Sequence, residues 1–240
     1  MNLCLGIEAT AHTFGVAVVS FEGKVLSNER DMFTTTSGGM VPMEVAKHHE
    51  EVKEKVLGRA LVKAGVSLKD ISLISYSHGP GLGPSLLVGM RFANSISEKH
   101  IIPVIGANHA MAHLTIGNLM CKVKDPVYLY VSGVNTQIIA RTGDRYRIFG
   151  ETLDIGLGNA LDKLGRHMGM GFPAGPKIEQ TATEGEYHEL AYSIKGMDVS
   201  FAGMVTRGSQ LFDKGVPVSD ICYSFQETAF AMLAEIAERA

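Results

Sequence analysis

The chain of 240 residues, with 45% hydrophobic and 20% charged residues, is long enough for one large globular domain or two modest ones. Its net charge of −3 argues against a general attraction for nucleic acid, so an RNA substrate would need a local basic patch or a partner. Three distant cysteines, Cys4, Cys121 and Cys222, indicate neither a disulfide framework nor a thiolate zinc site. Because Glu8 interrupts any signal peptide and no membrane span is visible, we expect a cytoplasmic protein.

Residues 3–30 predict a meander of three strands. Apolar runs at 3–7 and 14–19 flank a turn of short side chains from Glu8 to Thr13, and a third strand follows near 24–29. Backbone N–H groups in such a turn suit an anionic ligand, although a plain hairpin turn explains it equally well.

Residues 127–153 repeat this layout. The apolar run 127–131 leads into the small turn 132–136, and strands resume at 137–140 and 146–153. We therefore predict an internal duplication, with the two turns as jaws around one ligand.

The segment between the meanders predicts alternating helices and strands. A helical stripe ends at Gly65, a strand covers 71–76, and a glycine-rich turn at 79–85 leads into a helix at 86–97. This turn is either an anion site at a helix start or a connection where packing requires glycine. A further strand at 101–105 completes an α/β pattern.

The second half predicts helices at 158–168, 177–183 and, through a stripe from Ile221 to Ile236, at the end of the chain. Residues 193–206 give no firm assignment. No counterpart of the strand, glycine turn and helix at 71–97 follows, so we expect the C-terminal part of the second lobe to be missing.

His109 and His113 are the sharpest chemical signal. Side chains four residues apart share a helix face, and neutral imidazoles are common ligands of zinc and iron. Two ligands are too few for a site, and an exposed or interior histidine pair is the plainer explanation.

Seven segments in order resemble the Kae1/TsaD family of tRNA N6-adenosine threonylcarbamoyltransferases, in its archaeal and eukaryotic Kae1 form. They are residues 6–13 (GIEATAHT), 79–84 (GPGLGP), 108–113 (NHAMAH), 130–137 (YVSGVNTQ), 152–163, 173–179 (PAGPKIE) and 222–228 (CYSFQET). The resemblance implies the duplicated two-lobe α/β fold of actin, Hsp70 and the sugar kinases, with lobes at 1–115 and, incomplete, at 116–240.

The activity that the resemblance implies is transfer of a threonylcarbamoyl group from threonylcarbamoyl-AMP to N6 of the adenosine beside the anticodon of tRNA. Its nucleotide ligand would be threonylcarbamoyl-AMP, ATP or AMP, with magnesium as a further option. The implied partners are tRNA and the subunits of a KEOPS complex, which resemble Bud32, Pcc1 and Cgi121.

The implied site comes from matching motif positions. His109, His113 and Tyr130 would bind one iron or zinc ion, and the family's fourth ligand, an aspartate, lies in a motif that this sequence lacks. The nucleotide contacts would be Tyr130, Val131, Ser132, Gly133, Val134, Asp162, Gly175 and Glu179. Val134, Ala9 and Ala174 stand where the family often has glycine, and a side chain at such a position is expected to push a bound phosphate outward.

The general base is not evident, and Glu8 and His12 in the first turn are the candidates. A kinase or chaperone-like ATPase on the same fold would use both turns without needing the histidines. A zinc protease is disfavoured, since Ala110 occupies the position after the first histidine where such enzymes need glutamate. A scaffolding role within a complex is the third alternative.

Overall fold

The computed structural model describes residues 2–35 and 40–240. By their contacts these residues form two compact units: one contains the chain up to Thr34 and Met40–Lys122, and the other contains Thr35 and Val123–Ala240. The lobe limits predicted at 1–115 and 116–240 stay a prediction.

The first unit contains a five-stranded sheet in the order β3-β2-β1-β4-β5. The predicted meander is present as β1 (Leu3–Glu8), β2 (Thr13–Ser20) and β3 (Val25–Met32), all antiparallel. Strict alternation of buried and partly exposed residues along β1 and β2 marks the face that packs on the core. Strands β4 (Ile71–Gly79) and β5 (Val104–Asn108) then add parallel to β1.

The strand predicted at 101–105 is wrong at its start. Ile101 has φ of 57° and ends the preceding helix, and Pro103 has no N–H to give to a ladder. The strand β5 therefore begins at Val104, and its carboxyl end runs directly into the histidine pair.

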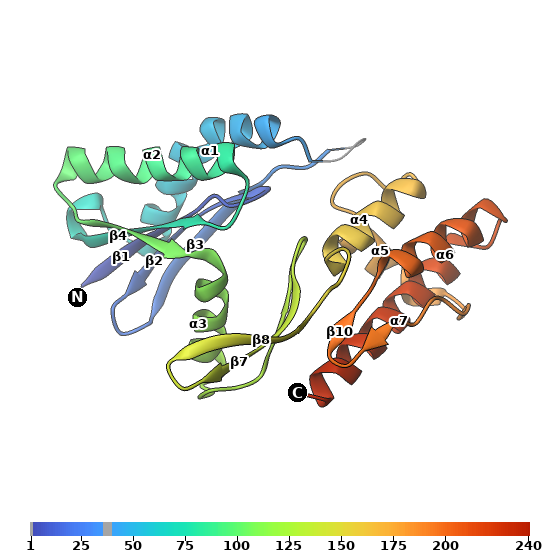
Figure 1. Cartoon of the computed structure of the whole chain (residues 1–240). Helices are drawn as coiled ribbons and strands as arrows, with labels where there is room; N and C mark the ends of the chain where they lie inside the picture. Colours follow the sequence, from blue (N-terminus) through green and yellow to red (C-terminus); the bar gives the residue numbers. More distant parts are fainter. Residues whose placement is uncertain (1, 36–39) are drawn as a thin grey trace. The chain divides into compact units, whose positions relative to one another are not determined.

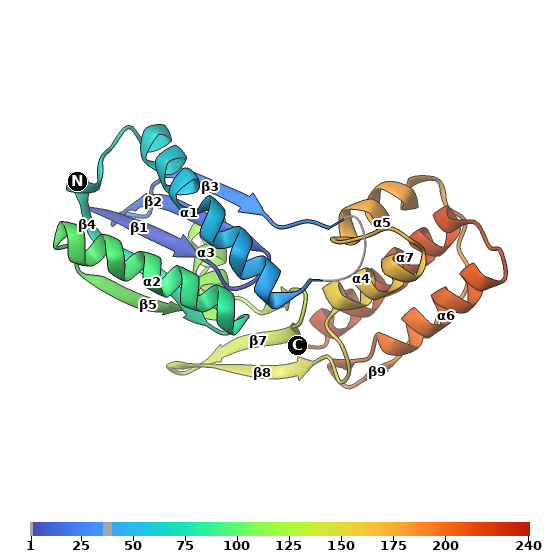
Figure 2. The same cartoon turned by 90° about the horizontal axis from the view of Figure 1, so that it is seen from above.

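Helices α1 (Pro42–Ala64) and α2 (Gly83–His100) cover one face of this sheet, and α3 (His109–Cys121) lies on the other side (Figures 1 and 2). Proline at the start of α1 and Gly65, with φ of 68°, at its end explain the helix limits. A short 3-10 helix, η1 (Leu68–Asp70), precedes β4. The core between sheet and helices includes Leu5, Phe14, Val18, Val56, Ile74 and Phe92.

The second unit holds a three-stranded sheet and a group of helices. Strands β6 (Tyr128–Val131), β7 (Thr136–Thr142) and β8 (Arg145–Glu151) repeat the antiparallel meander. The other elements are α4 (Leu157–His167), α5 (Gly175–Thr181), η2 (Ala182–Glu184), β9 (Ile194–Lys195), β10 (Asp198–Val199), α6 (Ala202–Asp213) and α7 (Val218–Glu238).

Helix α6 has no counterpart among the sequence predictions. Its first N–H groups are bound by a distant carboxylate, because Asp154 accepts hydrogen bonds from Phe201 N at 3.0 Å and Ala202 N at 2.9 Å. The core of this unit includes Ile138, Leu164, Phe201, Met204, Ile221 and Phe225. Among the described residues, no helix combines the length and apolar character that crossing a membrane requires.

Candidate metal and nucleotide site

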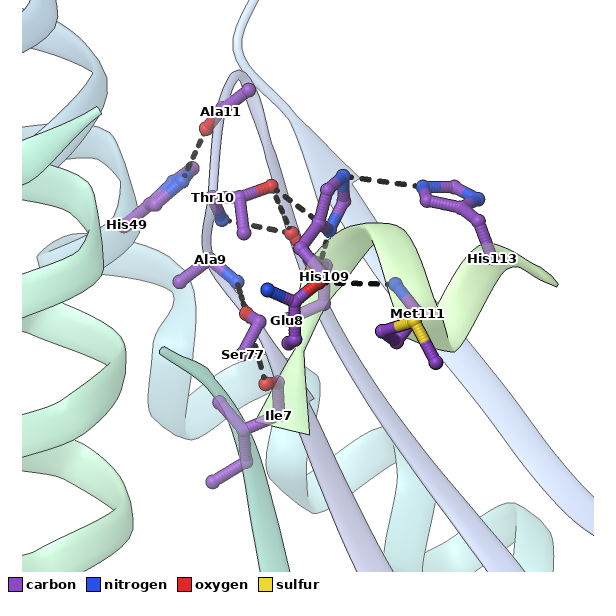
Figure 3. Close-up of polar contacts among 11 residues, drawn as sticks. Ile7, Glu8, Ala9, Thr10, Ala11, His49, Ser77, His109, Met111 and His113 are labelled. Carbon is purple, nitrogen blue, oxygen red and sulfur yellow. Dashed lines mark hydrogen bonds and ion pairs between the residues drawn. The ribbon is translucent and has the colours of Figure 1, made fainter. Parts of the chain in front are cut away.

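The first turn is built around the Glu8 carboxylate, where β1 ends. Thr10 N donates to Glu8 Oε1 at 2.8 Å, and the Thr10 hydroxyl donates to the same oxygen. Figure 3 shows these contacts together with Ala9 N, which donates to the buried Ser77 hydroxyl on β4 at 3.2 Å. The Ser77 hydroxyl also donates to the Ile7 carbonyl at 3.4 Å, so the chain is fixed to β4 on both sides of Glu8.

The histidine pair sits at the start of α3. Asn108 caps this helix by accepting a hydrogen bond from Met111 N at 3.1 Å. His109 and His113 follow one helical turn apart, and their Nε2 atoms converge to 3.2 Å with the rings at 89° (Figure 3). The predicted shared helix face is present.

Glu8 is the partner of the other ring nitrogen of His109. Glu8 Oε2 lies 3.2 Å from His109 Nδ1, across 101 positions of sequence. Burial acts to raise the pKa of Glu8, but hydrogen bonds from His109 and Thr10 outweigh it and lower the pKa to about 2. The carboxylate accepts a hydrogen bond from Nδ1–H of His109. In the neutral ring, Nε2 then carries a lone pair that points toward His113.

This pair fits a transition metal ion. A carboxylate that holds Nδ1–H while Nε2 faces a partner nitrogen is the arrangement that orients metal-bound histidines in proteins. Partial burial and the neighbouring His109 also lower the pKa of His113, which favours the neutral form that ligates. Within residues 2–35 and 40–240, no group of three or more His, Cys, Asp or Glu side chains gathers to form a larger site.

Tyr130, the third ligand that the resemblance implies, belongs to the other compact unit. It lies on β6 opposite Gln137 of β7, and only 7% of its surface is exposed. Its role as a ligand and as a nucleotide contact stays a prediction. The same holds for His12, whose carbonyl accepts a hydrogen bond from Phe33 N at 2.8 Å.

The second turn is closed by backbone contacts. Ser132 N donates to Asn135 O at 2.7 Å, and Asn135 N returns a bond to the Ser132 hydroxyl at 3.0 Å. The carbonyls of Ser132 and Gly133 accept bonds from Gly158 N and Asn159 N of α4, at 3.1 and 2.8 Å. Val131 and Val134 project outward, 39% and 69% exposed.

A pocket of about 730 Å³ lies in the second unit, a size typical of small-molecule sites. Gly175 and Glu179 of α5, two of the nucleotide contacts that the resemblance implies, line it; their role as contacts stays a prediction. Asp162 binds the backbone directly before α5: its Oδ1 accepts a hydrogen bond from Ala174 N at 2.8 Å.

Helix α7 contributes pocket residues that the sequence analysis did not name as site residues, among them Tyr223, Gln226 and Phe230. Their spacing of three and four residues places them on one helix face. Phe230 is 55% exposed and lies on the face of α7 opposite the buried stripe. An aromatic residue at such a position is the sequence signal that could have revealed this side of the pocket.

The glycine-rich turn has a direct packing requirement at Gly81. A Cβ there would lie 2.5 Å from the Thr10 carbonyl oxygen, and Leu82 N donates to that same oxygen at 2.7 Å. Glycine thus lets this loop brace the first turn, which supports the packing explanation at this position.

Comparison with known proteins gives consistent results. The family model described as "TsaD: tRNA N6-adenosine threonylcarbamoyltransferase" matches residues 24–240. The tRNA N6-adenosine threonylcarbamoyltransferase of Thermococcus kodakarensis is 51% identical over 240 residues, which cover 99% of this chain and 73% of that protein. The enzyme of the same name from Archaeoglobus fulgidus is 50% identical, with coverage of 99% and 73%.

A longer relative carries a different name. The probable bifunctional tRNA threonylcarbamoyladenosine biosynthesis protein of Thermoplasma acidophilum is 48% identical over 239 residues, 99% of this chain and 45% of that protein.

Two solved structures share the fold at low identity. Component A of the (R)-2-hydroxyglutaryl-CoA dehydratase of Acidaminococcus fermentans has a TM-score of 0.56 at 10% identity, covering all of this chain and 78% of that one. HypF of Thermococcus kodakarensis has a TM-score of 0.57 at 12% identity, covering 98% and 40%. These confirm the predicted actin, Hsp70 and sugar-kinase class of fold. The family model and the relatives of about 50% identity show that the chain belongs to the TsaD family of tRNA N6-adenosine threonylcarbamoyltransferases.

Proposed function

We propose that this protein transfers a threonylcarbamoyl group from threonylcarbamoyl-AMP to N6 of the adenosine beside the anticodon of tRNA. The observation that carries the proposal is the Glu8–His109–His113 arrangement, in a chain about half identical to enzymes named for this transfer. A new bond joins N6 to the carbamoyl carbon, the bond from that carbon to the phosphate oxygen breaks, AMP leaves with the electron pair, and N6 loses one proton.

His109 and His113 would hold an iron or zinc ion, with Tyr130 as the proposed third ligand. Such an ion supplies Lewis acid chemistry, polarising the carbamoyl or phosphate oxygens of the substrate. Glu8 keeps the His109 ring in the orientation and tautomer that ligation needs, through the 3.2 Å contact with Nδ1.

Glu8 is better suited to this positioning role than to that of general base. With a pKa of about 2, its carboxylate is a weak proton acceptor near neutral pH, where an efficient base has a pKa close to the working pH. Of the two candidates in the first turn, His12 is the one we retain as base.

The second unit would bind the nucleotide. Gly175 and Glu179 line a pocket large enough for an adenosine, and the Asp162 carboxylate binds Ala174 N directly before α5, the helix that carries both residues. The turn Ser132–Val134 would approach the phosphate side. We propose tRNA binding shared with KEOPS-type partner subunits, because a net charge of −3 provides no general attraction for RNA.

The test is a transfer assay with the protein, its partner subunits, tRNA, threonine, bicarbonate, ATP and the enzyme that forms the adenylate. Digested tRNA is expected to contain threonylcarbamoyladenosine with the wild type and with His100→Ala, an exposed histidine at the end of α2. His109→Ala is expected to abolish it.

Absence of the modified nucleoside with the wild type, or an unchanged yield with His109→Ala, would contradict the proposal. ATP hydrolysis that needs only magnesium and is indifferent to His109 and His113 would instead favour the kinase or chaperone-like ATPase.

A further inference from the structure

A partly buried series of hydrogen-bonded side chains connects β3 and α1 to the first turn. His49 Nε2 lies 2.8 Å from the Ala11 carbonyl oxygen, and His49 Nδ1 lies 3.3 Å from Nδ1 of His48. His48 Nε2 in turn lies 2.9 Å from Asp31 Oδ1. His49 is completely buried, so each of its ring nitrogens needs a partner within the protein.

The protons in this chain follow from the acceptors at its two ends. A carbonyl oxygen only accepts, so His49 Nε2 carries a proton and donates it to Ala11. Neutral His49 then presents Nδ1 as an acceptor, and His48 Nδ1 must donate to it. The Asp31 carboxylate also accepts, so His48 carries protons on both nitrogens and is a cation paired with Asp31.

The surroundings support this distribution of charge. The rings of Phe14 and Phe33 pack edgewise on His49 and His48, with centroids at 5.5 and 5.9 Å. Burial lowers the pKa of His49 to about 4, and the nearby His48 and His12 act in the same direction, against the Ala11 bond and Glu8. His49 is thus neutral near neutral pH.

The ionisable groups around His48 and His49 come from β3, from α1 and from the first turn. On β3, Asp31 Oδ2 lies 3.9 Å from an Arg59 nitrogen of α1, and Glu29 pairs with Arg59 and Lys63. The turn itself contributes Glu8 and His12. Asp31 therefore lies between His48 and Arg59.

The turn receives one hydrogen bond at each of three successive carbonyls. Leu82 N donates to Thr10 O at 2.7 Å, and Phe33 N donates to His12 O at 2.8 Å. Between these backbone donors, His49 supplies a side-chain donor to Ala11 O. Because Thr10 N and the Thr10 hydroxyl bind Glu8, the shape of this turn sets where the Glu8 carboxylate meets His109.

We propose that His49 is a positioning residue for the transfer reaction: as the Nε2–H tautomer, with His48 as the donor to its Nδ1, it anchors the Ala11 carbonyl and keeps Glu8 against His109 Nδ1. The link to transfer rests on the proposed function, whereas the hydrogen-bonded chain can be tested without it.

The direct test is the protonation of each ring in ¹⁵N-labelled, metal-free protein, read from long-range ¹H–¹⁵N correlation spectra at pH 6.5. Variants His48→Gln and His49→Gln assign the signals. His49 is expected as the neutral Nε2–H tautomer and His48 with both nitrogens protonated. A neutral Nδ1–H tautomer at His49, or a neutral His48, would overturn the proposal.

The consequence for the site is tested by removing the donor. In His49→Leu the Nδ1–H signature of His109 is expected to weaken, and kcat for transfer to fall about tenfold with KM for tRNA unchanged, the low end of the range for outer-shell partners. His49→Gln, which places an N–H near the same carbonyl, is expected to restore both. Equal behaviour of the two variants would overturn the positioning role.

Two further outcomes stay decisive. If His49→Leu does not fold, His48→Leu removes the donor to Nδ1 from the partly exposed side. Because the Ala11 carbonyl still accepts, His49 is expected to stay the Nε2–H tautomer, and a change to the Nδ1–H tautomer counts against the proposal. If the wild type shows no transfer at all, the proposed function fails while the spectra still decide the hydrogen-bonded chain.

Discussion

The two turns of the duplicated meander occupy equivalent places between their strands but are held in different ways. The first turn is fixed largely by side chains: Glu8 binds Thr10 and His109, and His49 binds the Ala11 carbonyl. The second is held by backbone bonds to the start of α4 and by one serine, Ser132. The same strand layout therefore carries ionisable side chains at the turn in one unit, whereas in the other unit the turn is formed mainly by hydrogen-bonded backbone.

The largest expected effect is on the second turn, where backbone meets backbone. A Cβ at Gly156 would lie 2.3 Å from the Val134 carbonyl oxygen, so we expect Gly156→Ala to lower the free energy of unfolding by about 3 kcal/mol. The matched control is Gly58→Ala in α1, where nothing lies within 4 Å and alanine should stabilise by about 0.5 to 1 kcal/mol. Urea unfolding measures both; similar small effects would show that the second turn is not held by this close contact.

The next effect is specific to the first turn and depends on pH. The pKa of His49 is lowered from 6.5 to about 4, so between these values the unfolded chain binds a proton that the folded chain does not. Stability from this residue is complete above pH 6.5 and is lost as the pH falls toward 4, by about 3 kcal/mol.

His49→Gln has no such proton, which provides the comparison. The stability difference between wild type and His49→Gln should shift against the wild type as the pH is lowered from 7 to 4.5, while contributions from other groups cancel. A difference that stays constant over this range would mean that His49 does not remain neutral in the folded protein.

The smallest effect concerns the only side-chain bond described above in the second turn. Ser132→Ala removes the acceptor for Asn135 N, and we expect a cost of about 1 kcal/mol in unfolding experiments. A loss as large as that of Gly156→Ala would show that side chains, rather than backbone, hold this turn as well.

Much of the fold follows from local patterns. The apolar runs at 3–7 and 14–19 and the helical stripes ending at Gly65 and Ile236 record burial directly, so they predicted β1, β2, α1 and α7. Helix α6 was not predicted, because its N-terminal N–H donors bind Asp154, which lies 48 residues from Ala202 in the sequence. The start of β5 was misplaced because Ile101 adopts a left-handed conformation that no periodicity reveals.

The site was partly predictable for the same reason. The spacing of His109 and His113 gave their shared helix face, since that geometry is local. Their partner Glu8 could be named only as a candidate base, because its contact with His109 spans 101 residues and arises from the packing of β1 beside β4 and β5. The chain from Asp31 through His48 to His49 left no sequence signal beyond two adjacent histidines.

The most direct test of the account is zinc binding to the metal-free protein, measured by titration calorimetry for the wild type, Glu8→Gln and Glu54→Gln, an exposed carboxylate on α1. If Glu8 prepares His109 for ligation, Glu8→Gln should weaken zinc affinity about tenfold and Glu54→Gln should leave it unchanged. Equal affinities for all three proteins would contradict the claim that the first turn is built to hold a metal-binding histidine.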